Sequence, residues 1–238
     1  MNAKKNCLII SGGDYSPINN ILNYDYCIAC DKGYEYSRRM DIIPDVIVGD
    51  YDSYEGDITS TVNSGCYEEG KSPKVITFPK EKDDTDTMLA VKHALRMGIE
   101  QITICCALGG RMDHTIANIS TMLYVVTHGG VCEIVSECDH MILTSADYIN
   151  NKSADLFLDC RIDNKKIILP RKNHCSLSLF ALSGNCEGVN IRGTKYEVSN
   201  ITLHNDTSLG ASNEWKDNEA TIEIGRGILL IIMSQIPI

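Results

Sequence analysis

The first 145 residues alternate short apolar runs with segments of helical periodicity, and this alternation limits the possible folds more than any other feature. Met88, Val91 and Leu95 fall on one stripe of a helix predicted over residues 84–97. Runs that are apolar throughout, separated by helices, are typical of a parallel sheet covered on both faces. We therefore predict an α/β N-terminal domain over residues 1–145, a mostly parallel sheet with flanking helices. Its strands are expected at residues 7–11, 26–30, 46–48, 75–78, 101–108, 131–135 and 141–144, and its other helices at 34–40 and 113–127.

The pattern changes after about Ser145. Cys175 to Phe180 alternates small polar with large apolar residues, as a half-buried strand does. Short runs with β character follow one another without a helical stripe, at residues 156–160, 166–169, 175–182, 201–204, 220–224 and 228–233. Residues 146–238 are therefore predicted to form an all-β antiparallel sandwich domain.

The chain of 238 residues is acidic, with 32 Asp and Glu against 22 Lys and Arg and a formal net charge of −10. This balance argues against non-specific nucleic-acid binding, which depends on basic surface. The longest clean apolar run, residues 228–233, is far shorter than the ~18 residues of a membrane span. The apolar part of the N-terminus is too short for a signal peptide. We expect a cytoplasmic protein with no nucleic-acid or membrane partner.

The eleven cysteines are scattered and mostly lie inside apolar runs. Reduced core cysteines in a cytosolic protein explain this better than a disulfide scaffold does. Cys27 and Cys30 form a C-x-x-C, but positions i and i+3 of a strand point to opposite faces. No second cysteine or histidine pair completes a zinc set. We interpret these cysteines as core packing.

Acidic side chains in the first half collect directly after the predicted strands. Because the carboxyl ends of parallel strands share one edge, where ligands bind, these carboxylates should converge on one site. Mg²⁺ would relieve their repulsion, since it prefers oxygen ligands and binds through a few carboxylates plus substrate phosphates. The acids are Asp31, Asp50, Asp52, Asp83, Asp84, Asp86 and Asp113.

Each group of acids also has a local interpretation. The aspartates at residues 83–86 could cap a helix and complement its dipole. Residues 50–53 could form a turn. His114 beside Asp113 could be an acid–base dyad, or it could only cap or orient a helix. These interpretations explain poorly why four acidic loops each follow a strand.

Basic side chains accompany the acids. An arginine can bind a phosphate through two parallel hydrogen bonds, and lysines supply point charges. The sequence contains neither G-x-x-x-x-G-K-[ST] nor G-x-G-x-x-G, so the standard phosphate-binding loops are excluded. Acids for a metal and bases for phosphate indicate a metal–nucleotide site. The basic residues concerned are Lys32, Lys80, Lys82 and Arg111.

Short motifs occur in both halves. Those of the first half are Ala29-Cys-Asp-Lys-Gly33, Gly49-Asp-Tyr-Asp-Ser53, Lys82-Asp-Asp-Thr-Asp86 and Gly109-Gly-Arg-Met-Asp-His114 with Asn118. Those of the second half are Gly193-Thr-Lys-Tyr196, Ser212-Asn-Glu214 and Gly227-Ile-Leu-Leu-Ile-Ile232. In order and spacing, the motifs resemble those of the thiamine pyrophosphokinase family over nearly the whole chain. Thr194 departs from the bulky apolar residue common in the family, and residues 54–74 fit no motif.

The resemblance implies an α/β nucleotide-binding domain followed by a β-sandwich, in a homodimer with active sites between subunits. It implies transfer of the terminal pyrophosphate of ATP to the hydroxyethyl oxygen of thiamine, which gives thiamine diphosphate and releases AMP. Mg²⁺ is the expected cofactor.

The resemblance also implies three groups of site residues. The catalytic and metal-binding carboxylates would be Asp50, Asp52, Asp83 and Asp86. The nucleotide would lie at Asp31, Lys82, Arg111, Asp113 and His114. Thiamine, a cation suited to acidic and aromatic groups, would lie at Tyr196, Ser212, Asn213 and Trp215.

Two other functions stay open. The same acidic crevice could serve a pyrophosphokinase for another heterocyclic alcohol, such as a hydroxymethylpterin, although the motif residues at 195–196 and 212–214 favour thiamine. The chain could also be a non-catalytic module that senses a nucleotide or thiamine, but such a module would not need four metal-competent acids.

Overall fold

The computed structural model describes residues 6–18, 24–49, 62, 72–77 and 83–236. The chain divides into two compact units, which are taken separately below. Unit 1 comprises Met1–Val125 and Val135–Glu137, and unit 2 comprises Val126–Ile134 and Cys138–Ile238. The boundary predicted between residues 145 and 146 stays a prediction.

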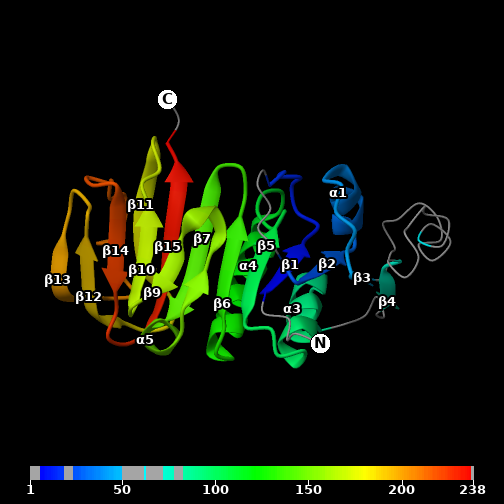
Figure 1. Ribbon diagram of the computed structural model, residues 1–238, viewed down its shortest axis with the longest axis horizontal. Helices are drawn as coiled ribbons and strands as arrows, with labels where there is room; N and C mark the ends of the chain where they lie inside the picture. The colour runs from blue at the N-terminus through cyan, green and yellow to red at the C-terminus, as the bar shows by residue number, and fades with distance from the viewer. Residues whose placement is uncertain (1–5, 19–23, 50–61, 63–71, 78–82, 237–238) are drawn as a thin grey trace. The chain divides into compact units, whose positions relative to one another are not determined.

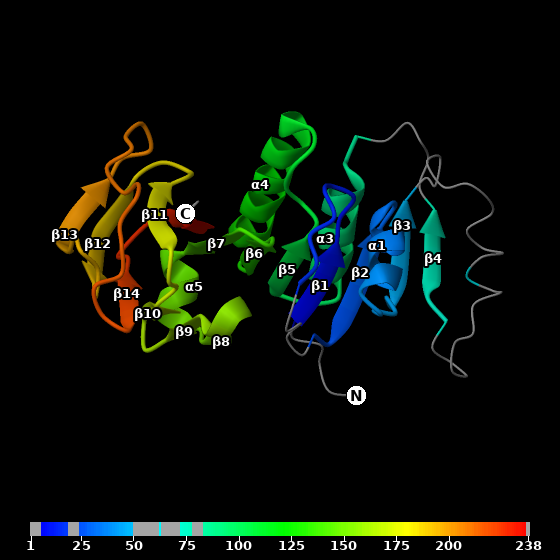
Figure 2. The same ribbon diagram turned by 90° about the horizontal axis from the view of Figure 1, so that it is seen from above.

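Unit 1 contains a parallel sheet in the order β5-β1-β2-β3-β4 (Figures 1 and 2). β1 pairs in parallel with both β2 and β5, and β3 pairs in parallel with β2 and β4. The predicted parallel sheet of the first half is therefore confirmed. The strands are β1 (Asn6–Ile10), β2 (Tyr26–Cys30), β3 (Val46–Gly49), β4 (Lys74–Thr77) and β5 (Gln101–Cys105).

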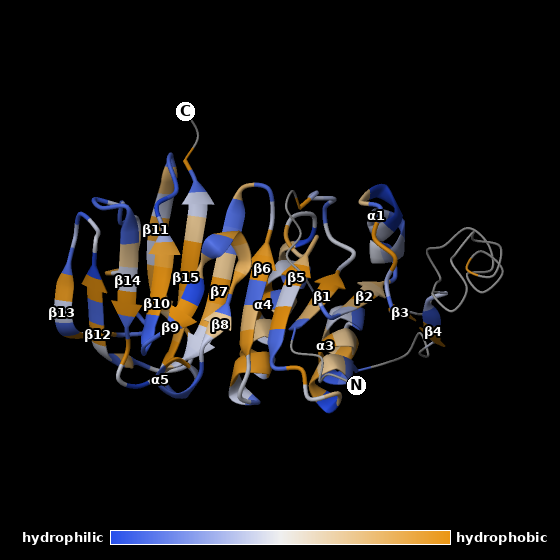
Figure 3. Cartoon of the chain, in the orientation of Figure 1, coloured by the Kyte–Doolittle hydropathy of each residue, from blue (hydrophilic) through white to orange (hydrophobic). Residues whose placement is uncertain are grey.

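Among the described residues, α1 (Gly33–Arg39) lies between β2 and β3 in the sequence, α3 (Asp86–Arg96) lies between β4 and β5, and α4 (Met112–Thr127) follows β5. α1 and α3 both pack on β1 and β2. All five residues of β2 are buried, and Ile9, Ile28 and Ile47 have no exposed surface. Figure 3 shows hydrophobic colour on β1, as on many of the other strands. Burial on both faces explains why these strands are apolar throughout rather than alternating.

Unit 2 contains antiparallel strands in two sheets. One has the order β11-β15-β7-β6, and the other has the order β13-β12-β14-β10-β9-β8. Leu177 and Ile231 from the first sheet share one hydrophobic core with Ile167 and Ile222 from the second. Two sheets that enclose a common core make a sandwich, as predicted. The strands are β6 (Val131–Val135), β7 (Asp139–Ser145), β8 (Ala154–Asp155), β9 (Arg161–Asp163), β10 (Lys166–Pro170), β11 (Cys175–Ala181), β12 (Cys186–Arg192), β13 (Val198–Leu203), β14 (Glu219–Glu223) and β15 (Ile228–Gln235).

Two local predictions for the second half were wrong. Residues 156–160, expected as a strand, contain the 3₁₀ turn Phe157–Asp159, in which Leu158 and Asp159 have positive φ. A short helix, α5 (Ala146–Asn151), lies where no helical stripe was expected, capped by Ser145. The six residues of α5 and the three of the 3₁₀ turn are too few to show a helical period in the sequence, so neither element could be predicted from periodicity.

The cysteines pack in the core as predicted. Eight of the ten that the structure describes are buried, and all ten are free thiols. Burial raises the pKa of the Cys27 thiol above its usual range and that of Cys160 to about 12, so both stay protonated at neutral pH. Over the described ranges, no helix combines the length and apolar character needed to cross a membrane.

A buried polar group lies inside the sandwich of unit 2. The Glu133 carboxylate accepts hydrogen bonds from His140 Nε2 at 2.7 Å and from the Phe157 main-chain N–H at 2.9 Å. Glu133 and His140 are both buried, and the Phe157 ring meets the imidazole edge-on. Glu133 thus ties β6, β7 and the 3₁₀ turn together, at the cost of burying a carboxylate.

We expect Glu133→Ala to lower the free energy of unfolding by about 3 kcal/mol, because it leaves two buried donors without their acceptor. Chemical denaturation followed by the fluorescence of Trp215, the only tryptophan in the chain, measures this change. Glu187→Ala is the control, since that side chain is exposed and makes no hydrogen bond within the described chain. Its effect should stay within about 0.5 kcal/mol. Equal unfolding midpoints for the two variants would contradict the prediction.

Candidate active site

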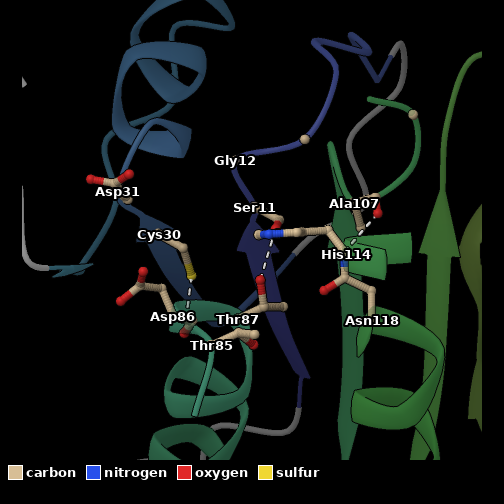
Figure 4. A pocket seen from close by; sticks show the side chains of 12 residues that line it. Ser11, Gly12, Cys30, Asp31, Thr85, Asp86, Thr87, Ala107, His114 and Asn118 are labelled. Atoms are coloured by element: carbon tan, nitrogen blue, oxygen red, sulfur yellow. Dashed lines mark hydrogen bonds between the residues drawn. The ribbon is translucent and has the colours of Figure 1, made fainter. Parts of the chain in front are cut away.

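A polar cavity of about 200 Å³ lies at the carboxyl edge of the parallel sheet in unit 1 (Figure 4). The segments that follow β1, β2 and β5 contribute to it, together with the starts of α3 and α4. This is the edge at which parallel α/β sheets bind ligands. The lining residues are Ser11, Gly12, Gly13, Cys30, Asp31, Thr85, Asp86, Thr87, Ala107, Gly109, His114 and Asn118.

Hydroxyl groups and main chain from the end of β1 form the centre of the cavity. The Ser11 and Thr87 hydroxyls lie 2.8 Å apart and hydrogen-bond each other. The Ser11 N–H donates to Cys105 O at 2.9 Å, so β1 stays tied to β5 beyond the end of the strand. The Gly13 N–H then donates to Cys106 O at 2.8 Å. These bonds fix the path of the chain where it borders the cavity.

Two of the predicted carboxylates, those of Asp31 and Asp86, line the cavity on one side (Figure 4). Asp31 ends β2 in a left-handed conformation with φ of 46°. Asp86 is the first residue of α3, and its main-chain carbonyl accepts the Cys30 thiol at a donor–acceptor distance of 3.6 Å. Carboxylates on one side of a small polar cavity suit Mg²⁺, which binds through one or two carboxylates plus substrate phosphates. Among the residues that the structure describes, no three His, Cys, Asp or Glu side chains form a metal-ligand group.

The other acids of this segment have different surroundings. Asp84 pairs with Lys92 at 2.6 Å, and Asp83 is exposed and is not among the lining residues. Thr85, rather than an aspartate, caps α3, because its hydroxyl oxygen accepts the Met88 N–H. In the local interpretation the aspartates cap α3 and complement its dipole, but Thr85 is the cap and only Asp86 lies in the first turn, where it also lines the cavity.

α4 supplies the opposite side of the cavity. Asn118 is buried, and its amide donates to Ala107 O at 2.7 Å, which joins α4 to the segment after β5. His114 lines the same side with an exposed imidazole. The main-chain N–H of His114 donates to Asp113 Oδ1 at 3.0 Å. The predicted His114–Asp113 contact is therefore a local one at the start of the helix.

Arg111 and Asp113 form an ion pair at the start of α4. The guanidinium donates to both carboxylate oxygens, at 3.1 and 2.5 Å. The side chains are 73% and 63% exposed, so water screens the pair and its effect on stability is small. The hydrogen bonds from Arg111 lower the pKa of the Asp113 carboxyl, and the same pairing raises the pKa of Arg111. A phosphate at Arg111 would have to displace this carboxylate.

The structure places the predicted thiamine residues in unit 2. Asn213 is buried, and its side chain bonds both Tyr196 N and Tyr196 O, at 3.0 and 2.9 Å. Trp215 is only 7% exposed, and its indole N–H donates to Leu169 O at 3.2 Å. Ser212 is exposed, with φ of 58°, and the Tyr196 side chain is 59% exposed. Asn213 and Trp215 thus serve the sandwich itself, whereas the Tyr196 ring is exposed and has the Lys195 ammonium 5.5 Å from its centroid. Three other predicted site residues, Asp50, Asp52 and Lys82, lie outside the described residues.

Comparison with protein families gives two matches, in the order of the two units. The model of the thiamin pyrophosphokinase catalytic domain matches residues 19–134, and that of the thiamin pyrophosphokinase vitamin B1 binding domain matches residues 165–229. The chain belongs to the thiamin pyrophosphokinase family. It is an enzyme, as the members of this family are.

Relatives of the thiamin pyrophosphokinase family match along the full length. The thiamine pyrophosphokinase of Bacillus subtilis (strain 168) is 26% identical over 231 residues, which cover 95% of this chain and 97% of that protein. A crystal structure of the Bacillus subtilis enzyme superimposes with a TM-score of 0.78 at 22% identity, over 97% of this chain and 99% of that one. The Enterococcus faecalis family protein gives 0.74 at 24% identity, over 98% and 100%. The predicted fold class is confirmed.

The sequence did not identify several residues that line the cavity. Ser11 ends the strand predicted over residues 7–11, and Gly12 and Gly13 follow it, but the predicted site was built from charged side chains alone. Position after a parallel strand was the signal that could have found them. Thr87 gave no such signal, because it belongs to the helix α3 and bonds Ser11 through a contact between distant parts of the sequence.

We expect the Asp113 carboxyl to titrate at lower pH in the wild type than in the Arg111→Ala variant, because the guanidinium stabilises the charged form. The ion pair is therefore present at neutral pH and is lost as the pH falls through the lowered pKa of Asp113. Carboxyl-carbon NMR titration measures both midpoints. Arg226→Ala in unit 2 is the control and should leave the Asp113 midpoint unchanged. An unchanged midpoint in Arg111→Ala would show that the exposed pair does not form in solution.

Proposed function

We propose that this chain transfers the terminal pyrophosphate of ATP to the hydroxyl of thiamine, with Mg²⁺, and releases thiamine diphosphate and AMP. The observation that carries the proposal is the polar cavity at the carboxyl edge of the parallel sheet. It lies within the region matched by the catalytic-domain model and is lined by Asp31 and Asp86. The match of the second half to the vitamin B1 binding domain supports thiamine as the acceptor.

The carboxylates would hold the metal. Asp31 and Asp86 are placed for this, and we propose that Asp50, Asp52 and Asp83 complete the acidic set. When bound, Mg²⁺ would neutralise the phosphate charge that builds up during transfer. With Mg²⁺ bound among them, these carboxylates would no longer repel one another or the phosphates of the nucleotide.

The rest of the cavity would orient the reactants. In phosphoryl transfer the protein mainly aligns the attacking and leaving oxygens. The Ser11 and Thr87 hydroxyls and the main chain at Gly12 offer neutral hydrogen-bonding groups near the carboxylates. A carboxylate of the cavity would accept the proton that the thiamine hydroxyl loses as the new O–P bond forms.

Basic side chains near the cavity would supply the positive charge that the phosphates need. Arg111 and Lys82 are our candidates, and His114 and Asp113 would lie near the nucleotide with them. Arg111 could bind a phosphate once its two hydrogen bonds to Asp113 are broken. A guanidinium binds a carboxylate or a phosphate through two parallel hydrogen bonds.

Thiamine would bind at the sandwich domain. Tyr196 offers an exposed aromatic ring, a good partner for the thiamine cation, and Ser212 lies in an exposed turn. Asn213 would act by holding Tyr196, and Trp215 by packing in the hydrophobic core of the sandwich. We further propose that the protein acts as a homodimer, a form that covers sheet edges. Its many buried thiols suit the reducing cytoplasm.

The function is tested by incubating the protein with ATP, Mg²⁺ and thiamine and measuring AMP and thiamine diphosphate. A hydroxymethylpterin used in place of thiamine tests the alternative acceptor. Release of AMP with the pterin and not with thiamine would overturn the choice of substrate. Binding of both ligands without AMP would favour a sensing module.

We expect Asp86→Asn to reduce kcat by about 100-fold or more, because it removes a carboxylate that would hold Mg²⁺ beside the phosphates. Asp50→Asn should act in the same way. Asp84→Asn is the matched control. It changes a neighbouring aspartate that pairs with Lys92 and does not line the cavity, so it should keep most of the activity. Normal turnover of Asp86→Asn at saturating Mg²⁺ would refute the assignment of the metal site.

We expect Tyr196→Ala to raise the KM for thiamine by about 10-fold and to leave the KM for ATP nearly unchanged, since it removes an exposed aromatic contact to a cation. Steady-state kinetics with each substrate varied in turn measures both constants. Tyr24→Ala in unit 1 serves as a control for the loss of a tyrosine. Equal changes in both constants would argue against a thiamine contact.

A further inference from the structure

The segment that crosses the cavity after β1 is held from two sides. The Gly13 N–H donates to Cys106 O at 2.8 Å, and the Asp14 N–H donates to Leu108 O at 3.1 Å. The Asp14 carboxylate in turn accepts the Gly110 N–H at 3.1 Å. One side of the Ser11–Asp14 segment, which we call the glycine loop, is thus bound to the segment after β5.

Besides the Ser11–Thr87 contact, the glycine loop is held on its other side by the Tyr36 side chain on α1. Its hydroxyl donates to the Gly13 carbonyl at 2.9 Å. The side chain is nearly buried, with 3% of the residue exposed, and its ring packs at 5.2 Å from the Tyr15 ring. A buried hydroxyl with one main-chain partner fixes the direction of that partner's carbonyl.

α1 is placed so that Tyr36 can reach the loop. A Cβ at Gly33, the first residue of α1, would come within 2.1 Å of the Ile10 carbonyl at the end of β1. The helix therefore begins in direct contact with the strand that leads into the glycine loop. Tyr36 lies one turn further along.

We propose that Tyr36 is a positioning residue of the pyrophosphotransfer site, which holds the glycine loop in the conformation that receives the ATP phosphates. The inference rests on the function proposed above. Gly12 and Gly13 line the cavity beside Asp31. The N–H groups of Ser11, Gly13 and Asp14 already donate to main-chain carbonyls, so Gly12 N–H is the group that the loop would offer to a phosphate, as main-chain N–H groups of such loops commonly do. Tyr36 would not touch ATP. It would act through the loop.

Tyr36→Phe tests the inference, because it removes only the hydroxyl and keeps the ring against Tyr15. The KM for ATP should rise by about 3- to 10-fold, the worth of one hydrogen bond, while kcat and the KM for thiamine change less than twofold. Tyr15→Phe is the matched control. Its hydroxyl makes no hydrogen bond within the described residues, and its kinetics should equal those of the wild type. Unchanged KM for ATP in Tyr36→Phe would overturn the inference.

Hydrogen exchange separates this inference from the proposed function. The Gly13 and Asp14 amides should exchange at least threefold faster in Tyr36→Phe than in the wild type or in Tyr15→Phe. Equal exchange in Tyr36→Phe and the wild type would overturn the role of Tyr36 in holding the loop, even in an active enzyme. Faster exchange in a protein that makes no AMP would support that role but refute the proposed reaction.

Discussion

Parallel pairing of β1 with strands on both of its sides is the constraint on which the site in unit 1 depends. It forces the chain to leave β1, β2 and β5 at the same edge of the sheet. The bond from Ser11 N to Cys105 O continues the pairing beyond the strand, so the first residues of the cavity keep the geometry of the ladder. Carboxylates, hydroxyls and main-chain groups from distant parts of the sequence meet there without any long side chain having to reach across.

Close approach of main chain to main chain is the second condition. Gly33 brings α1 against the end of β1, and Gly109, with φ of 83°, lies so close to Asp14 that a Cβ would meet its carboxylate at 2.1 Å. These two glycines let a helix and a turn close around the cavity with few side chains between them. The side chains that remain, Asp31 and Asp86 among them, face the space that a ligand would fill.

Periodicity in the sequence predicted the strands of unit 1 and the edge at which a ligand would bind, because burial on both faces leaves a clear apolar pattern. Periodicity could not show that Asp86 lines the cavity and Asp84 does not. Which of them faces the cavity depends on where α3 begins, and a hydroxyl on Thr85 decides that. The roles of Asn213 and Trp215 also depend on tertiary contacts, with Tyr196 and Leu169, that leave no trace in local sequence.

The position of β15 bears on how the protein reaches its folded state. This strand, the last in the described chain, lies between β11 and β7, and pairs Ser145 with Ile228. During synthesis β7 therefore leaves the ribosome long before its antiparallel partner exists, and its edge stays open until then. Closing so long a loop is entropically costly, which makes this pairing a slow step. The sandwich of unit 2 is thus open to edge-to-edge aggregation in the nascent chain until β15 has been made.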